Sequence, residues 1–320
     1  MSTTTTATST ATSPPEGMAE LRTDPIFLSQ FLRLPLQKID TIHPSPSALP
    51  GKPNAAATAA GTGTVPPTPL AEAPPLEALP QVKPWPAFLA DLQKRLANLD
   101  ETEAYQHILP PAAHRAGDLP KATMLPTTYL WLIIQAWQPF NRVLNLEEEV
   151  SAGGHTDKGA LRGPLQIGDH LPQHEQGAAG VVLPRQVIFR PDELETGKVR
   201  GCIFVREPWL VDLRHLYSTS DGSEGTPLSH EALVPGGADE ADAAGGKTAA
   251  AVEALQGLLA YMKSTKTTHG ILTTYDHFIF VRTTQDWSTV ELSPPVGAQD
   301  RKLTVFAALW HWARDVASQP

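Results

Sequence analysis

Cysteine is almost absent from this sequence of 320 residues, which contains only Cys202. One cysteine excludes a disulfide within the chain and a cysteine-rich zinc site, and it is typical of a reducing compartment. A secretory signal is not predicted, because residues 1–16 are Thr, Ser, Ala and Pro without a basic or an apolar region. No apolar run approaches the roughly 20 residues that a membrane span needs. We therefore expect an intracellular protein, cytoplasmic or nuclear, without a membrane partner.

Positive charge and the common catalytic motifs are also lacking. The formal net charge of −9 argues against a strongly basic nucleic-acid binder. The sequence has no GxSxG elbow, P-loop, GxGxxG or HExxH motif. Without these motifs, the sequence gives no reason to expect a standard serine hydrolase, a nucleotide-binding protein or a zinc protease.

Proline and glycine are abundant instead, with 31 and 23 residues, and they concentrate in low-complexity tracts. Residues 1–16 and 44–83 bury too little apolar area to fold, so region 1–83 is expected to be mostly disordered. Between the two tracts, residues 18–42 have the pattern of a short amphipathic helix. This helix either docks onto the folded part or binds a protein partner. The folded domain is expected over 84–320.

Within 84–320 the hydrophobic periodicity predicts an α/β fold with a mixed central sheet flanked by helices. Two polar stretches, at about 151–180 and 216–247, are expected to be surface insertions. Helices are predicted at about 88–96, 127–146, 248–263 and 303–316, and strands at about 187–189, 199–206, 269–274 and 278–281, with a further edge strand near 290–292.

Four short motifs follow one another in this domain. Pro191-Asp192 ends one predicted strand, and Pro208-Trp209 follows the next. The helix at 248–263 carries Gln256 and the pair Tyr261-Met262, and the following strand reads Gly-Ile-Leu-Thr-Thr-Tyr over 270–275. In this order and at these intervals, the set resembles the nuclease-like domains of the PD-(D/E)xK superfamily, of a type common in fungal proteins. The resemblance covers roughly residues 127–315.

The resemblance implies a restriction-endonuclease-like fold and a metal-dependent nuclease site. In that family the aspartate of the PD motif and an acid on the next strand hold Mg²⁺, and a lysine orients the attacking water. Carried over to this sequence, the first ligand is Asp192. With Pro208 as the anchor, the second ligand position is Phe204 and the lysine position is Arg206.

These two positions depart from the family pattern. A phenyl ring cannot hold a metal, and arginine is a poor base because its pKa is very high. Glu207 is a substitute acid only if a bulge turns it toward Arg206, since neighbouring strand residues point to opposite faces. Asp192 alone would hold Mg²⁺ weakly, and Arg206 is expected to pair with it. The candidate site therefore comprises Asp192, Arg206, Glu207 and Gln256, with no cofactor bound.

We therefore expect a degenerate, catalytically inactive nuclease-like domain that acts as a nucleic-acid-binding or interaction module. Two alternatives stay open: a metal-dependent phosphodiesterase that cleaves DNA or RNA with Mg²⁺, and a protein-interaction scaffold without nucleic acid. Residues 181–215 with 248–320 hold 12 Lys and Arg against 11 Asp and Glu, so DNA or RNA would bind weakly. The expected basic face comprises Arg190, Arg200, Arg206, Lys263 and Lys266.

Overall fold

The computed structural model describes the folded part of the chain in several ranges. These are residues 26–41, 80–99, 121–122, 125–151, 165–170, 185–194, 198–218, 226–228 and 243–319. The tract 1–16, and the tract 44–83 up to residue 79, lie outside them.

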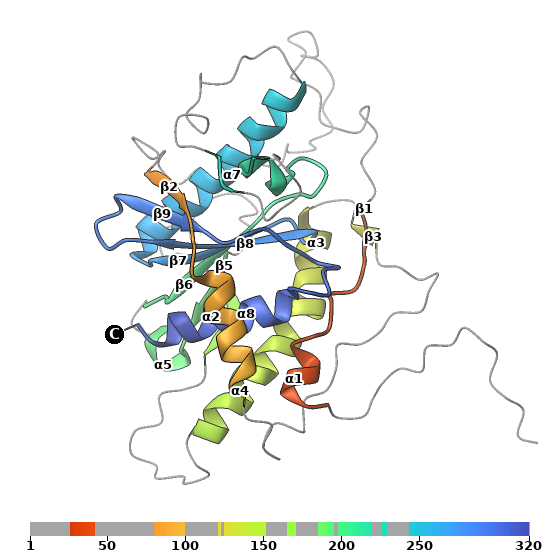
Figure 1. Cartoon of the computed structure of the whole chain (residues 1–320), viewed down its shortest axis with the longest axis vertical. Helices are drawn as coiled ribbons and strands as arrows, with labels where there is room; N and C mark the ends of the chain where they lie inside the picture. Colours follow the sequence, from red (N-terminus) through yellow and green to blue (C-terminus); the bar gives the residue numbers. More distant parts are fainter. Residues whose placement is uncertain are drawn as a thin grey trace, which may run out of the picture.

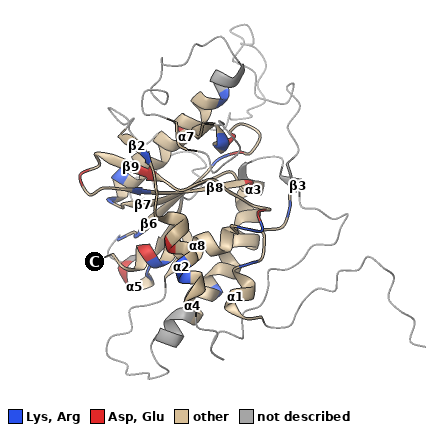
Figure 2. Cartoon of the chain, viewed as in Figure 1, with Lys and Arg blue, Asp and Glu red and all other residues tan. Residues whose placement is uncertain are grey.

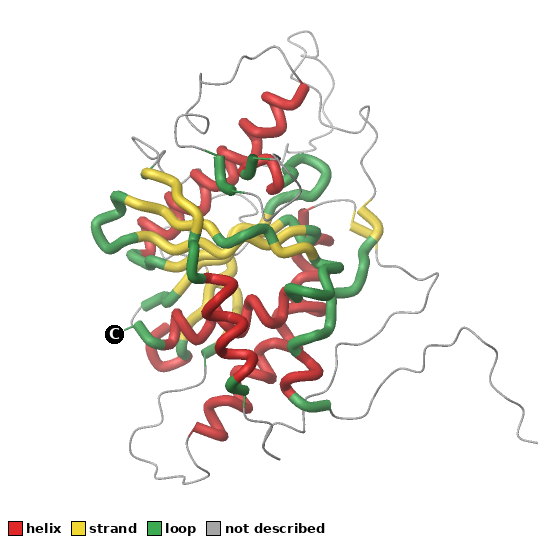
Figure 3. The backbone as a smooth tube through the Cα atoms, viewed as in Figure 1, coloured by secondary structure: helices red, strands yellow, loops and turns green. Residues whose placement is uncertain are grey.

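One mixed sheet of eight strands organises the described residues (Figure 3). Seven strands follow one another across the sheet, and the short strand β10 (Val296–Gly297) pairs with β8 in addition. In spatial order the seven are β2 (Gln81–Pro84), β9 (Thr289–Leu292), β8 (His277–Thr283), β7 (His269–Thr273), β6 (Gly201–Val205), β5 (Arg185–Phe189) and β4 (Gln166–His170).

The strands predicted near 187–189, 199–206 and 269–274 are neighbours in this sheet. β5 and β6 are antiparallel neighbours, and β7 lies parallel to β6 after the crossover helix α7 (Ala243–Thr265). Parallel strands need such a crossover because the chain must return to the same end of the sheet. The coarse expectation of a mixed sheet flanked by helices is therefore correct.

Helices cover both faces of this sheet and divide the core into two layers. In Figure 1, α7 lies on one face, and α2 (Phe88–Ala97), α4 (Gln138–Ser151) and α8 (Val305–Ala317) lie on the other. Successive strand residues alternate between the layers: Val187 packs in the α7 layer and Ile188 in the layer of α8. This alternation explains why β5 reads as a nearly continuous apolar run.

The predicted helix at 127–146 is longer and irregular. It comprises α3 (Leu125–Leu132), a π-helical segment η2 (Ile133–Trp137) and α4. Pro139 lacks the N–H that would bond to the carbonyl of Gln135, and the Gln138 N–H reaches Ile133 instead. The wider turn brings the Trp137 indole N–H to the buried side-chain oxygen of Gln186, at 2.5 Å.

Three segments differ from the sequence-based expectation. β4 lies inside the stretch 151–180 that is predicted as a surface insertion, and β2 begins at Gln81 within the tract 44–83. Helix α7 starts at Ala243, inside the predicted insertion 216–247. Both strands lie at the two ends of the sheet and obtain their hydrogen bonds from distant residues, β2 from β9 and β4 from β5. Such non-local pairing leaves little trace in local periodicity.

The N-terminal segment 26–41 contains only one short helix, α1 (Leu28–Phe31). The remainder of the predicted helix 18–42 is extended after residue 33, while residues 18–25 and 42 lie outside the described residues. The two-residue strand β1 (Asp40–Thr41) pairs with β3 (Lys121–Ala122). Leu28, Phe31 and Leu36 are buried in the layer of α8, so the folded unit includes residues before 84.

In the described part of the chain, no helix combines the length and the apolar character that crossing a membrane requires.

Candidate functional site

The structure separates Asp192 from the other predicted site residues. In the β5–β6 hairpin Gln186 lies opposite Ile203 and Ile188 opposite Gly201, so the end of β5 meets the beginning of β6. Asp192 follows β5, on the short helix α5 (Pro191–Leu194), whereas Phe204 lies three residues, about 10 Å, beyond Gly201. The expectation that Asp192 lies beside Phe204 and Arg206 is therefore wrong, because an antiparallel register places them toward opposite ends of the strands.

At its own end, Asp192 is exposed, and the acid that makes contacts is its neighbour Glu193. The Arg200 Nε donates to Glu193 Oε2 at 2.6 Å, and its Nη1 donates to the Gln319 carbonyl at 2.9 Å. The bonds from Arg200 lower the pKa of Glu193, and the same bonds raise the pKa of buried Arg200. Arg200 therefore connects Gln319 to the β5–β6 hairpin, and its pair with Glu193 has a structural role.

Phe204, for which the resemblance implies the second metal ligand, packs against α7. A Cβ added to Gly257 of α7 would lie 2.8 Å from the tip of the Phe204 ring, so the ring packs closely against the helix at this glycine. Gln256 lies next to Gly257 on the same helix and is half-buried. The contact between α7 and β6 is therefore apolar at a position where a metal ion would need oxygen ligands.

Arg206 and Glu207 do come together. The strand ends at Val205, so the alternation of an ideal strand no longer separates their side chains. Arg206 Nε lies 3.9 Å from Glu207 Oε2, and Arg206 Nη2 lies 4.0 Å from Glu253 Oε1 on α7. The expected pair between Arg206 and Asp192 is absent among the described residues. Arg206 instead has two acidic neighbours at the carboxyl end of β6.

These residues do not fit a magnesium site. No group of three His, Cys, Asp or Glu side chains in the described residues is arranged to hold a metal ion. The first expected ligand, Asp192, lies at the other end of the hairpin, and the second is replaced by Phe204. The positions implied by the resemblance thus provide no pair of carboxylates for the metal-dependent step.

Several titratable residues that the sequence analysis did not single out lie near the carboxyl ends of β6 and β7. Asp212, the cap of the short helix η4 (Leu213–Leu216), accepts from Arg214 at 2.7 Å, which lowers the pKa of Asp212 to about 2. In the β7–β8 turn, burial raises the pKa of Asp276 and lowers that of His277. Carboxyl ends of parallel strands commonly bind ligands, and this position is the signal that could have found the cluster.

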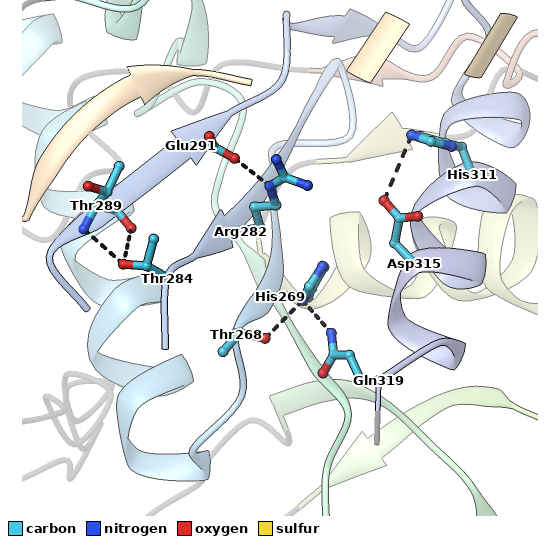
Figure 4. A network of polar contacts seen from close by, with 9 residues as sticks. All are labelled: Thr268, His269, Arg282, Thr284, Thr289, Glu291, His311, Asp315 and Gln319. Carbon is cyan, nitrogen blue, oxygen red and sulfur yellow. Dashed lines mark hydrogen bonds and ion pairs between the residues drawn. The ribbon is translucent and has the colours of Figure 1, made fainter. Parts of the chain in front are cut away.

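A second polar cluster lies at the opposite end of the strands, where β7 begins at His269 (Figure 4). His269 Nδ1 is 3.0 Å from Thr268 Oγ1 and also contacts Gln319, and burial lowers the pKa of His269 to about 4. His311, on α8, is fully buried, and neither ring nitrogen has a hydrogen-bond partner among the described residues. Its Nε2 lies 3.9 Å from Asp315. Both imidazoles lie near the Trp85 ring, with ring centroids 6.3 and 6.5 Å away for His269 and His311.

The residues that carry the family resemblance have packing roles in this structure. A Cβ on Gly270 would lie 2.6 Å from the Met262 sulfur, so this glycine allows α7 to pack against β7. The Tyr275 N–H donates to Thr273 Oγ1 at 3.0 Å, and Tyr275 takes a positive φ of 74° in the β7–β8 turn. The motifs Tyr261-Met262 and 270–275 thus hold the crossover helix to the sheet.

Replacing Gly270 with alanine is expected to lower the free energy of unfolding by about 1–3 kcal/mol, because the new methyl group overlaps Met262 and Leu258. Urea denaturation followed by tryptophan fluorescence would measure the change. Gly297→Ala is the matched control: its nearest neighbour would be 3.9 Å away, so it should change stability by less than about 0.5 kcal/mol. Equal effects of the two substitutions would contradict the close contact between α7 and β7.

Comparisons of the chain with models of known families, with curated proteins and with solved structures found no match.

Proposed function

We propose that this chain is a degenerate nuclease-like domain without catalytic activity that acts as a protein-interaction module. The observation that carries the proposal is the contact of Phe204 with Gly257, with Arg206 held near Glu207 and Glu253. An apolar ring and a cation with acidic neighbours occupy the positions where the resemblance would require an acid and a lysine. Neither can bind Mg²⁺ or activate water.

The order of the elements supports the restriction-endonuclease-like part of the proposal. Two antiparallel strands, β5 and β6, precede a crossover helix, α7, and a parallel strand, β7. The motifs of the PD-(D/E)xK superfamily, which this chain resembles, lie on elements in the same order. In addition, Gln256 and Tyr261-Met262 lie on that helix, and residues 270–275 form the following strand and turn.

The arginines favour a protein partner over nucleic acid. Of the five residues of the expected basic face, Arg190 and Arg200 are buried, and Arg206 has acidic neighbours. Only Lys263 and Lys266, near the end of α7, are exposed. Figure 2 likewise shows Lys and Arg spread over both sides of the sheet. Phosphate binding needs several cations on one face, so the expected basic face does not form.

The absence of catalysis can be tested with the full chain. We expect no cleavage of plasmid DNA or RNA with Mg²⁺ or Mn²⁺, and no saturable heat when Mn²⁺ is titrated into the protein in a calorimeter. The double change Phe204→Glu with Arg206→Lys should not create a metal site, because Asp192 lies toward the other end of the hairpin. Saturable Mn²⁺ binding by the unmodified chain, abolished by Asp192→Ala, would contradict the proposal.

The choice of partner class is tested by gel shifts with DNA and RNA between 50 and 200 mM salt. We expect no specific shift at micromolar protein concentration. A shift that weakens steeply with salt, and that is lost in Lys263→Ala with Lys266→Ala but kept in Arg33→Ala, would assign nucleic-acid binding to the domain instead.

A further inference from the structure

Residues 26–41 contact the domain in the way a bound peptide does. Five apolar side chains of this segment are buried against the layer of α8, at intervals that leave the residues between them exposed or half-buried. The Phe31 ring lies 4.4 Å from that of Phe306 on α8. The buried side chains are Leu28, Phe31, Leu32, Leu36 and Ile39.

The segment also makes hydrogen bonds that fix its register. The Leu36 N–H donates to the Ala298 carbonyl at 2.9 Å, and the Leu36 carbonyl accepts from Gln299 Nε2. The Tyr275 hydroxyl donates to the Gln37 carbonyl at 2.7 Å. The Thr304 hydroxyl donates to the Leu32 carbonyl and also caps α8 by accepting from Ala307 N–H. We call Tyr275, Ala298, Gln299, Thr304 and Phe306 the docking surface.

The main sheet does not include this segment. β1 pairs only with the two-residue strand β3, and every pairing of the eight-stranded sheet is made by residues from Gln81 onward. In the sequence, 38 residues, 42–79, separate the segment from the next described residue, Pro80. The segment is therefore connected to the rest of the domain mainly by side-chain packing and by hydrogen bonds that include those to Tyr275, Ala298, Gln299 and Thr304. These contacts can form whether or not the segment belongs to the same chain.

We propose that the docking surface is a peptide-binding site, that residues 26–41 occupy it as a ligand from the same chain, and that the same segment of a second copy can replace it. The Leu-x-x-Phe-Leu-x-x-x-Leu pattern of residues 28–36 is the recognised feature. A tethered ligand typically has an effective concentration in the millimolar range, so the segment of the same chain prevails at micromolar protein. Exchange becomes measurable once the connection is cut. This proposal concerns a different surface from the nuclease-like positions and does not depend on their inactivity.

The experiment uses the full chain with a protease recognition sequence inserted within residues 55–60. After cleavage, size-exclusion chromatography and mass spectrometry report whether the N-terminal piece remains bound. A fluorescein-labelled peptide of residues 24–43 is then added, and its fluorescence anisotropy follows exchange. We expect the piece to remain bound at micromolar concentration, and the labelled peptide to replace it in the cut protein at least tenfold more readily than in the uncut protein.

Two peptide variants serve as controls. Phe31→Asp places a charge among the buried rings and is expected to weaken binding about 100-fold or more. Arg33→Ala changes an exposed residue and should bind as the unmodified peptide does. As a second measurement without cleavage, two differently tagged copies of the full chain should form cross-linked pairs near millimolar concentration only.

Several results would overturn the proposal. The labelled peptide fails to exchange within a day, or it binds the cut and the uncut protein equally. Alternatively, the Phe31→Asp peptide binds as well as the unmodified one, or the cut protein loses its circular-dichroism spectrum and does not regain it with added peptide. Failed exchange or an unrecovered spectrum would make residues 26–41 an inseparable part of the fold. Equal binding to both proteins, or undiminished binding of the Phe31→Asp peptide, would show that the peptide does not bind at the docking surface.

Discussion

Replacing Phe31 with alanine is expected to lower the free energy of unfolding by about 3–5 kcal/mol. The Phe31 side chain is fully buried, and its ring contacts Phe306 in the first turn of α8. Alanine would leave a cavity between the N-terminal segment and this helix, and the neighbouring side chains can fill it only in part. Urea denaturation of the full chain, followed by tryptophan fluorescence, measures the change.

The control for this substitution is Arg33→Ala in the same segment. Arg33 is exposed, so its loss should change stability by no more than about 0.5 kcal/mol. A cost below 1 kcal/mol for Phe31→Ala would mean that the segment does not contribute to the core. The boundary at residue 84 expected from composition would then describe the stable unit better.

Acidification from pH 7 to pH 5 is expected to destabilise the protein through His269. Burial lowers the pKa of His269 from its usual 6.5 to about 4, so the folded protein resists protonation where the unfolded chain accepts it. The unfolded state thus binds more protons between pH 6.5 and 4, and the free energy of unfolding falls as the pH falls through this window. One pKa unit corresponds to about 1.4 kcal/mol, which gives about 2 kcal/mol by pH 5.

Other titratable groups also contribute to the pH dependence of stability. His311 adds to the loss, because burial lowers its pKa as well. The lowered pKa values of Glu193 and Asp212 cause a loss of stability only at more acidic pH. The raised pKa of Asp276 has the opposite effect, since the folded state then takes up a proton more readily.

The contribution of His269 is therefore measured as a difference between two proteins. Urea denaturation of the unmodified chain and of His269→Gln at pH 7, 6 and 5 gives the slope of stability against pH for each. We expect the slope of the variant to be shallower by about 2 kcal/mol over this range. Equal slopes would mean that His269 titrates normally, and that Trp85 and Gln319 do not exclude water from it.

Much of the fold can be predicted from the sequence because its signals are local. The apolar runs at 187–189 and 278–281 and the helical spacing after Trp85 correspond to β5, β8 and α2. The parallel partner of β6 is predictable as well, because a helix between two strands requires the chain to cross over. Strands β2 and β4 escape prediction, since neither contains a continuous apolar run and each is stabilised by pairing with a single neighbour at the edge of the sheet.

The candidate site is less predictable than the elements that carry it. From the resemblance, the sequence analysis selects Phe204 and Arg206, and the structure places them at and just after the carboxyl end of β6. The sequence does not reveal that Asp192 lies toward the opposite end, because this follows from the register of the hairpin. Nor does it reveal that Glu207 reaches Arg206, since this depends on the strand ending at Val205.

By itself, the sequence determined the mixed α/β architecture and the positions of the main helices and strands. Only the tertiary structure decided which of the candidate site residues meet, because antiparallel register places Asp192 away from Phe204 and Arg206. It also decided that residues 26–41 belong to the core. Their apolar side chains could have faced another protein equally well, and it is their contact with Phe306, Thr304 and Tyr275 that assigns them to this domain.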